Sequence, residues 1–419
     1  MYEKLLRAVT FAAASSLMSV ASCAAPVESA GAGEAESELV SKSLDVNDVS
    51  FLFPVAWNSS ERDAMLRLDT TGSFGPLLAK PMFEAAFAMG NVGALAQAPA
   101  IARARPYAMW RIVAARFDPC AARPDNASAC AVQLRLVAQP IVDVDAELRP
   151  AFGIARVGAL DFALHLVYEL PTAEATALVA QLRSLKAASS VPTTGKVLHV
   201  HPAMAREGIN GTFAQALKRT IVGAVGTTRL ARVTFFGSTD ATATGEGTRW
   251  GFAQGVVDGG RLVPAPLLGV ASVKLQVFDS SEGEGNPFKP VPTPPEHLGL
   301  YFTREYRTEF FEGRIGAART AAVRSHVSIE NPLRHSVANT DCASCHLPRV
   351  RAGEEALIDI RDVRFVAPVG TTVQRSKFLA EKGYVLRAFG HVETKAAVSQ
   401  RTINESAAVA DYVNTHFAR

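Results

Sequence analysis

Alternation of apolar and polar residues recurs along residues 51–280 and predicts strands. Residues 107–117 and 132–142 alternate with a period of two, as paired, half-buried strands do. Asp258 and Gly259 separate two more strand-like runs, and this dipeptide is a strong hairpin signal in that setting. These patterns predict a substantially antiparallel sheet. The other predicted strands are residues 51–55, 161–170, 229–236, 248–257, 260–266 and 270–278.

Helical patterns lie between these strands and again after them. The segment SSEGEGNPFKPVPTPPE is rich in Gly, Ser and Pro and predicts a linker at residues 281–299. We therefore predict an α+β fold, with an N-terminal mixed domain at 51–280 that contains the antiparallel sheet and a mostly α-helical domain at 300–419. Residues 402–405 have the spacing of a helix capping box ahead of the last predicted helix. The predicted helices are residues 76–104, 171–188, 209–225, 301–324, 372–382 and 403–416.

The first residues have the pattern of an export signal. Two basic residues precede an apolar stretch at 8–20, which is too short to cross a bilayer as a helix. The stretch runs into Val-Ala-Ser-Cys23, which resembles a bacterial lipobox. The resemblance implies lipidation of Cys23 and a periplasmic or outer-membrane lipoprotein of a bacterium, whereas an ordinary signal peptide cut just after Cys23 is the alternative. Residues 1–22 are thus a predicted signal peptide, and residues 23–50 a predicted flexible tether.

Composition and charge narrow the classes of protein. The chain is 48% hydrophobic and 20% charged, which excludes a disordered protein because so much apolar surface cannot remain in water. A formal net charge of +3 is not typical of a nucleic-acid-binding protein, and we expect no such partner. Export permits disulfides. Cys120 and Cys130 flank a polar loop between two predicted strands, and we expect them to be bonded, with two free thiols as the alternative.

The last two cysteines lie in Cys342-Ala-Ser-Cys345-His346, the attachment signature of c-type haem. On a helical turn these positions share one face, so both sulfurs can reach one porphyrin edge while His346 points at the iron. Here the chain resembles c-type cytochromes, over about residues 300–419. The resemblance implies one covalent haem c with His346 as its proximal ligand. The rivals are a thioredoxin-like disulfide and a four-cysteine zinc site, for which two cysteines are lacking.

The second axial ligand is left open by the sequence. All seven Met lie at or before Met204, so none follows the haem motif. His391, in a loop-like stretch, is the first candidate for the distal ligand, and His335 is the alternative. An iron with an open distal position is the third possibility.

Three further histidines form a weaker pattern. His199 and His201 share one face if their segment is a strand, and His165 on another strand makes a three-histidine metal site conceivable. Two polar residues at a strand end are the plainer interpretation.

Arginines gather around the haem motif in the sequence. Residues 313–352 carry six Arg against Glu330 and Asp341, a local charge of +4. Such a rim can steer an acidic redox partner or hold haem propionates, and a solvated surface is the alternative. We expect an exported single-haem c-type cytochrome that transfers electrons at the cell envelope, anchored to the membrane by its lipid. A peroxidase-like haem enzyme with an open distal site, and a ligand-binding surface lipoprotein with an accessory haem, remain as alternatives.

Overall fold

A computed structural model describes the chain from Ser43 to Phe417 with gaps, and all the described residues belong to one compact unit, Lys42–Arg419. The predicted signal peptide, Cys23, most of the predicted tether and nearly all of the predicted helix at 372–382 lie outside them. The described residues are 43–56, 58–90, 99–123, 129–143, 157–189, 191–239, 249–270, 273–279, 289–336, 339–346, 357–368, 373, 376 and 388–417.

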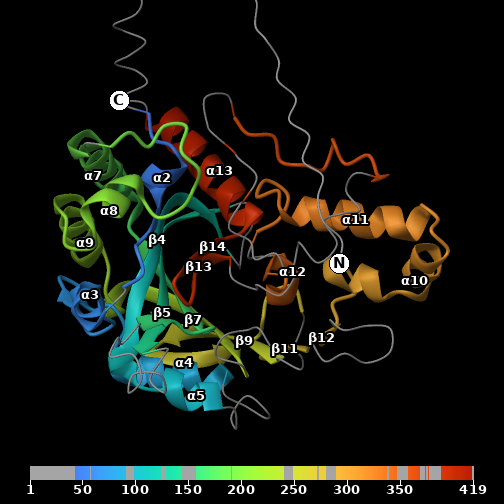
Figure 1. The fold of residues 1–419 in the computed structure, drawn as a ribbon, viewed down its shortest axis with the longest axis horizontal. Coiled ribbons are helices and arrows are strands. Elements are labelled where there is room, and N and C mark those ends of the chain that lie inside the picture. Colours follow the sequence, from blue (N-terminus) through green and yellow to red (C-terminus); the bar gives the residue numbers. More distant parts are fainter. Residues whose placement is uncertain are drawn as a thin grey trace, which may run out of the picture. The chain divides into compact units, whose positions relative to one another are not determined.

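Ten strands of the described residues form one antiparallel sheet (Figure 1). Its main path is β1-β4-β5-β7-β8-β9-β11-β12, with β6 paired to β5 and β10 to β9. The predicted pairing of 107–117 with 132–142 is confirmed as β4 against β5. The predicted hairpin is β9 and β10, turning at Gly259, whose φ of 54° favours glycine. The strands are β1 (Ser50–Leu52), β4 (Trp110–Ala122), β5 (Cys130–Asp143), β6 (Val157–Ala159), β7 (Ala163–Leu170), β8 (Leu230–Ser238), β9 (Arg249–Asp258), β10 (Arg261–Ala265), β11 (Leu275–Asp279) and β12 (Lys289–Val291), with two small hairpins, β2 (Thr71–Gly72) with β3 (Gly75–Pro76) and β13 (Phe389–Val392) with β14 (Lys395–Val398).

The sheet has two chemically different faces, because successive side chains of a strand point to opposite sides. Arg116 on β4 lies opposite Arg135 on β5, and His165 on β7 lies opposite Thr234 on β8, so these four side chains share one side. We call this side the polar face. The other side carries mainly Leu, Ala and Phe residues, among them Phe235, and we call it the apolar face.

Helices α4 and α9 cover the apolar face. Phe87 of α4 packs edge-on against Phe235, with ring centroids 5.7 Å apart, and Phe213 of α9 packs against Phe51 of β1. Burial of these rings is the kind of contact that stabilises a helix on a sheet. The helices are α2 (Val46–Val49), α3 (Ser59–Ala64), α4 (Lys80–Gly90), α5 (Pro99–Ala104), α7 (Ala175–Ala188), α8 (Pro202–Glu207), α9 (Thr212–Ala224), α10 (Arg304–Phe311), α11 (Ala317–Ile329), α12 (Cys342–His346) and α13 (Gln400–His416).

The C-terminal elements α12, α13 and β13 lie on the polar face (Figure 1). Ser406 of α13 shares a hydrogen bond of 2.7 Å with Ser50 of β1. The side-chain amide of Gln139 on β5 donates to the backbone carbonyl of His391 on β13 and accepts from its N–H. These C-terminal elements are therefore hydrogen-bonded to side chains of the sheet.

The mixed α+β class is confirmed, but the predicted boundary at 281–299 is not. Lys289–Val291, inside the predicted linker, forms β12 and extends the sheet beside β11. One hydrophobic core contains Trp250 of the sheet together with Ile403 and Val413 of α13. The structure therefore does not show a separate helical domain.

The start of the described chain also differs from the expectation. Residues 44–50, placed in the tether, are buried. Asp45 caps the short helix α2, and the backbone N–H and carbonyl of Leu44 both bond to the side-chain amide of Asn414, each at 2.8 Å. The polar side chains at the start of the described chain can be buried because they form hydrogen bonds with backbone groups.

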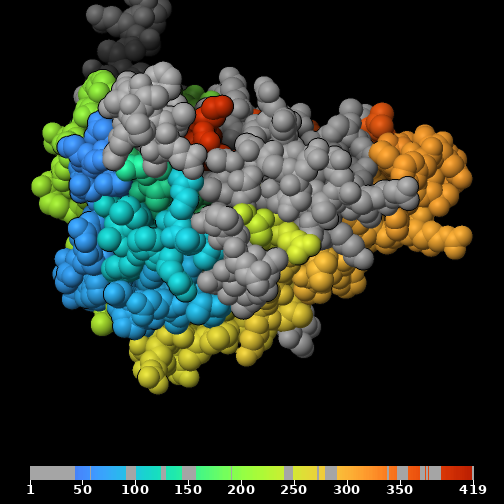
Figure 2. Space-filling model, turned by 60° about the horizontal axis from the view of Figure 1, so that its bottom comes forward, coloured from blue at the N-terminus to red at the C-terminus, as the bar shows by residue number. Residues whose placement is uncertain are grey.

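Two helix predictions need correction. The helix expected at 301–324 is two helices, α10 and α11, separated at Gly313, whose φ of 69° ends a helix readily. The last helix begins at Gln400, three residues before its predicted start at 403, and its cap is Ser399, whose side chain accepts from the N–H of Thr402. Figure 2 shows the orange surface of α10 and α11 well apart from the blue surface of the first elements. Across the described ranges, no helix has both the length and the apolar character to cross a bilayer.

Candidate functional site

The motif Cys-x-x-Cys-His forms one helical turn, α12, that is tied to the edge of the sheet. The carboxylate of Asp341 accepts the N–H of Ser344 at 3.1 Å, as a helix cap does, and the side-chain amide of Gln276 at 2.8 Å. Gln276, fully buried on β11, also accepts the N–H of Ala343 at 3.0 Å. Gly269 permits this close approach, because a Cβ there would lie 2.4 Å from the Asp341 nitrogen.

Both sulfurs of the motif are free thiols. Cys342 and Cys345 are half-buried on the same turn, and neither is bonded to the other. Burial raises the pKa of both thiols, that of Cys345 to about 11. A thiol–disulfide catalyst needs a thiolate at neutral pH, and therefore a lowered pKa. These protonated thiols are unfavourable for the thioredoxin-like rival and remain compatible with thioether formation.

The imidazole of His346 packs against three side chains of the polar face. It lies parallel to the ring of Phe236 on β8, with centroids 5.8 Å apart, and is tilted against Phe252 on β9 at 5.2 Å. The ring of His165 on β7 lies 6.1 Å from it, with 57° between the planes. Three neighbouring strands therefore place His346, and one of them brings a second imidazole beside it.

His165 is held neutral by its surroundings. Burial, followed by the neighbouring His346 and Arg116, lowers the pKa of its imidazole to about 3. A neutral imidazole is the form that binds a metal. This pair of histidines therefore has the donor chemistry of an axial ligand set.

Buried charges surround the pair. Glu405 of α13 forms ion pairs with Arg116 of β4 and, at 2.8 Å, with Arg401 one turn earlier. Burial alone would raise the pKa of the Glu405 carboxyl, but the arginines hold that pKa well below its ordinary value. Arg135 lies 3.9 Å from Asp118. Each of these five side chains is at most 17% exposed, so this is a desolvated network of positive and negative groups.

Arg232 of β8 adds a further guanidinium to the polar face. It is 7% exposed, and its Nε has no hydrogen-bond partner among the described residues. Burial lowers the pKa of Arg232 to about 10, while the thiol of Cys342 nearby acts in the opposite direction. A buried cationic group with an unsatisfied N–H calls for an anionic partner.

The predicted distal ligand His391 has other contacts. It is 1% exposed on β13, and its Nε2 donates to the backbone carbonyl of Phe53 at 2.9 Å. The alternative, His335, has its Nε2 at 2.9 Å from the hydroxyl of Ser328 and its Nδ1 at 3.4 Å from that of Thr340. Both histidines therefore already use ring nitrogens in hydrogen bonds.

The conceivable three-histidine site is not assembled in this form. His201 caps α8 by accepting the N–H of Ala203, and its ring stacks on Phe213 at 4.1 Å. His165 lies instead beside His346. Among the described residues, no group of three or more metal-binding side chains is assembled.

The other predicted sites lie only in part among the described residues. Cys120 and Cys130 form a disulfide between the end of β4 and the start of β5. Of the predicted arginine rim, Arg324 pairs with Asp362 at 2.5 Å on the surface. Cys23 lies outside the described residues.

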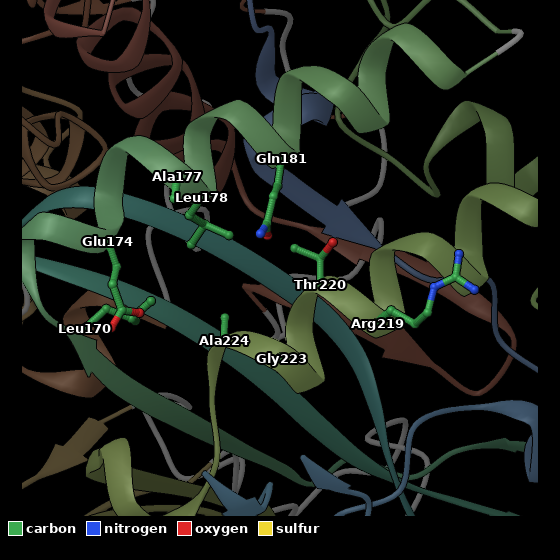
Figure 3. Close-up of a pocket in the computed structure, with 9 residues that line it drawn as sticks. All are labelled: Leu170, Glu174, Ala177, Leu178, Gln181, Arg219, Thr220, Gly223 and Ala224. Atoms are coloured by element: carbon green, nitrogen blue, oxygen red, sulfur yellow. The ribbon is translucent and has the colours of Figure 1, made fainter. Parts of the chain in front are cut away.

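A separate cleft of about 370 Å³ lies between α7 and α9 (Figure 3). Gln181 and Thr220 point toward it from the two helices, and Glu174 lies at one end. The carboxylate of Glu174 is paired with Arg229 at 2.6 Å. The cleft is lined by Leu170, Glu174, Ala177, Leu178, Gln181, Arg219, Thr220, Gly223 and Ala224.

Sequence reasoning identified the haem motif but missed the residues that face it. His165 and Arg232 lie 181 and 114 positions before His346 along the chain and meet it only through strand pairing. A polar residue at every second strand position gave no signal of this, since such alternation is typical of a sheet face that is open to solvent.

The donor set suits a haem held by two thioethers. Two free thiols share a turn with His346, a second imidazole lies beside it, and the Nε of the buried Arg232 guanidinium has no hydrogen-bond partner among the described residues. No family model matches the chain, no curated protein is detectably similar to it, and no solved structure matches it.

Proposed function

We propose that this chain is an exported single-haem c-type cytochrome that transfers electrons at the cell envelope. The observation that carries the proposal is the arrangement of α12. Its two protonated thiols and His346 share one turn that is fixed on the polar face of the sheet.

Each residue of the turn has a distinct role. The thiols of Cys342 and Cys345 would hold the haem as thioethers, each adding across one vinyl group so that a carbon–sulfur bond forms and the thiol proton passes to the neighbouring carbon, with no oxidant or reductant consumed. His346 would provide a nitrogen ligand, and Arg232 a cation for a propionate. When bound, the haem supplies a one-electron redox centre.

Electron transfer is favoured over catalysis by the packing around His346. Phe236 and Phe252 pack against its ring, and a second imidazole lies beside it. An iron held by both imidazoles would exchange electrons and have no open position for a small ligand. The proposed partner is a redox protein, with an acidic surface if the exposed arginines guide it.

Intact mass of the naturally matured protein tests the proposal. The full chain is produced in cells that attach haem c, and its mass and haem stain are measured. We expect the added mass of one haem in the wild type and in the double variant Cys120→Ser/Cys130→Ser. The double variant Cys342→Ser/Cys345→Ser should lack it. A wild-type mass without haem contradicts the proposal, and the same spectrum reports whether Cys23 carries acyl chains.

A further inference from the structure

His165 is the residue nearest the haem motif whose side chain has no evident structural task. It lies on β7, in the middle of the sheet, on the polar face. Its imidazole makes no side-chain hydrogen bond to the described residues, although it is half-buried and polar. A polar ring in such a place ordinarily has a partner.

The separation of the two imidazoles matches a shared ion. When two imidazoles bind one metal from opposite sides, each metal–nitrogen bond is about 2 Å and each ring centre lies roughly 1 Å behind its nitrogen, so the centres are roughly 6 Å apart. The ring centroids of His165 and His346 are 6.1 Å apart. The 57° between the ring planes is compatible with this, because both planes can contain the same axis through the ion.

We propose that His165, supplied by the central sheet, is the second axial ligand of the iron bound to His346. This inference rests on the proposed function. It assigns the distal position to a residue 177 positions before Cys342, outside the segment that resembles cytochromes c.

The two other candidates are occupied. The Nε2 of His391 donates to the carbonyl of Phe53, so ligation through it would leave a buried carbonyl unsatisfied. Both ring nitrogens of His335 lie within 3.4 Å of hydroxyl groups. His165 needs to break no hydrogen bond in order to bind.

The assignment has a structural consequence. The iron would join α12 to β7, and so link the haem motif to the centre of the sheet by a coordinate bond. A site with two imidazoles also has a lower reduction potential than one with Met and His, because thioether ligation raises the potential.

The spin state of the ferric haem in the full-length holoprotein tests the assignment. We expect a six-coordinate, low-spin spectrum in the wild type. His165→Ala should retain its covalent haem, as judged by mass, but become high-spin, and added imidazole should restore the low-spin spectrum. The matched controls His391→Ala and His335→Ala should remain low-spin without imidazole.

The variants also distinguish a wrong ligand assignment from the absence of haem. A low-spin His165→Ala protein without added imidazole, or a high-spin wild type, overturns the assignment while leaving haem attachment intact. Absence of covalent haem from the wild type overturns the proposed function and this inference together. If His165→Ala does not fold, His165→Met fills the same space with a side chain that can bind iron, and we expect a low-spin haem with a raised reduction potential. An unchanged potential in that variant contradicts the assignment.

Discussion

Glu405 is the carboxylate on which two largely buried arginines converge. Arg116 reaches it from the sheet and Arg401 from its own helix. Removing one member of such a group leaves the others charged and desolvated, which costs about 3–5 kcal/mol. Glu405 therefore neutralises charge at the contact between α13 and the polar face.

Replacement of Glu405 tests this contact. We expect Glu405→Gln to lower the free energy of unfolding at pH 7 by about 3 kcal/mol. The folded-state pKa of Glu405 is depressed, so its stabilisation is present above the unfolded value of about 4.3 and is lost as pH falls toward the folded value. The difference between wild type and variant should thus shrink by up to about 1.4 kcal/mol per pH unit below about 4.3. Denaturant unfolding at pH 7 and at pH 3 measures both effects.

The control for this experiment is an exposed pair. Glu312 contacts Arg314 at the surface, where both side chains are at least half exposed. Glu312→Gln should change the free energy of unfolding by less than about 1 kcal/mol. Equal effects of the two substitutions would contradict the role assigned to Glu405.

At the scale of elements, α12 shows how a turn of five residues is held in place. A helix this short does not form alone. Its N–H groups are satisfied by Gln276 on β11 and by the carboxylate of Asp341, which itself accepts from Gln276. The sheet edge thus determines where the haem motif lies.

Gln276→Ala should loosen this turn. The substitution removes three hydrogen bonds, to Asp341, to Ala343 and to the carbonyl of Pro292, and leaves the buried Asp341 with fewer donors, so we expect a loss of about 1–3 kcal/mol in the free energy of unfolding. Chemical denaturation of the purified protein provides the measurement. Gln181→Ala, on the exposed side of α7, is the control and should stay within about 0.5 kcal/mol of the wild type. An equally small loss for Gln276→Ala would contradict the role of Gln276 in holding α12 in place.

The elements differ in how well the sequence predicts them. Strict alternation located β4, β5 and the hairpin of β9 and β10, because a half-buried strand repeats its chemistry every two residues. The prediction of a single helix at 301–324 was wrong because the chain turns at Gly313. A pattern of apolar residues does not reveal the left-handed φ of that residue. The cap at Ser399 was missed because Thr402 and Glu405 imitate a capping box.

At the scale of the whole molecule, one sheet supports both parts that the sequence suggested as domains, since its strands end with β12 and the elements of residues 300–419 pack on its polar face. The segment at 281–299 has the composition of a linker, but its residues Lys289–Val291 pair with β11 as β12. Composition reports local flexibility and says nothing of long-range pairing. The neighbours of His346 could not be predicted for the same reason, since Phe236, Phe252 and His165 meet it only in the folded sheet.

A fragment of residues 300–419 should therefore fail to fold alone. Its helix α13 packs on β4, and its strand β13 accepts one hydrogen bond from Gln139 and donates one to it, whereas β4 and Gln139 lie outside the fragment. We expect no cooperative thermal transition by circular dichroism and rapid proteolysis, in contrast to the chain from residue 43 onward. A cooperative transition in the fragment would establish an autonomous C-terminal domain.

The paired bonds between Leu44 and Asn414 join the beginning and the end of the described chain. A polypeptide made from its N-terminus presents Leu44 long before Asn414 follows. Of the described helices α13 is the last to be made, so the polar face lacks this cover during that interval. Under the function proposed above, haem insertion would fall between the appearance of α12 and the docking of α13.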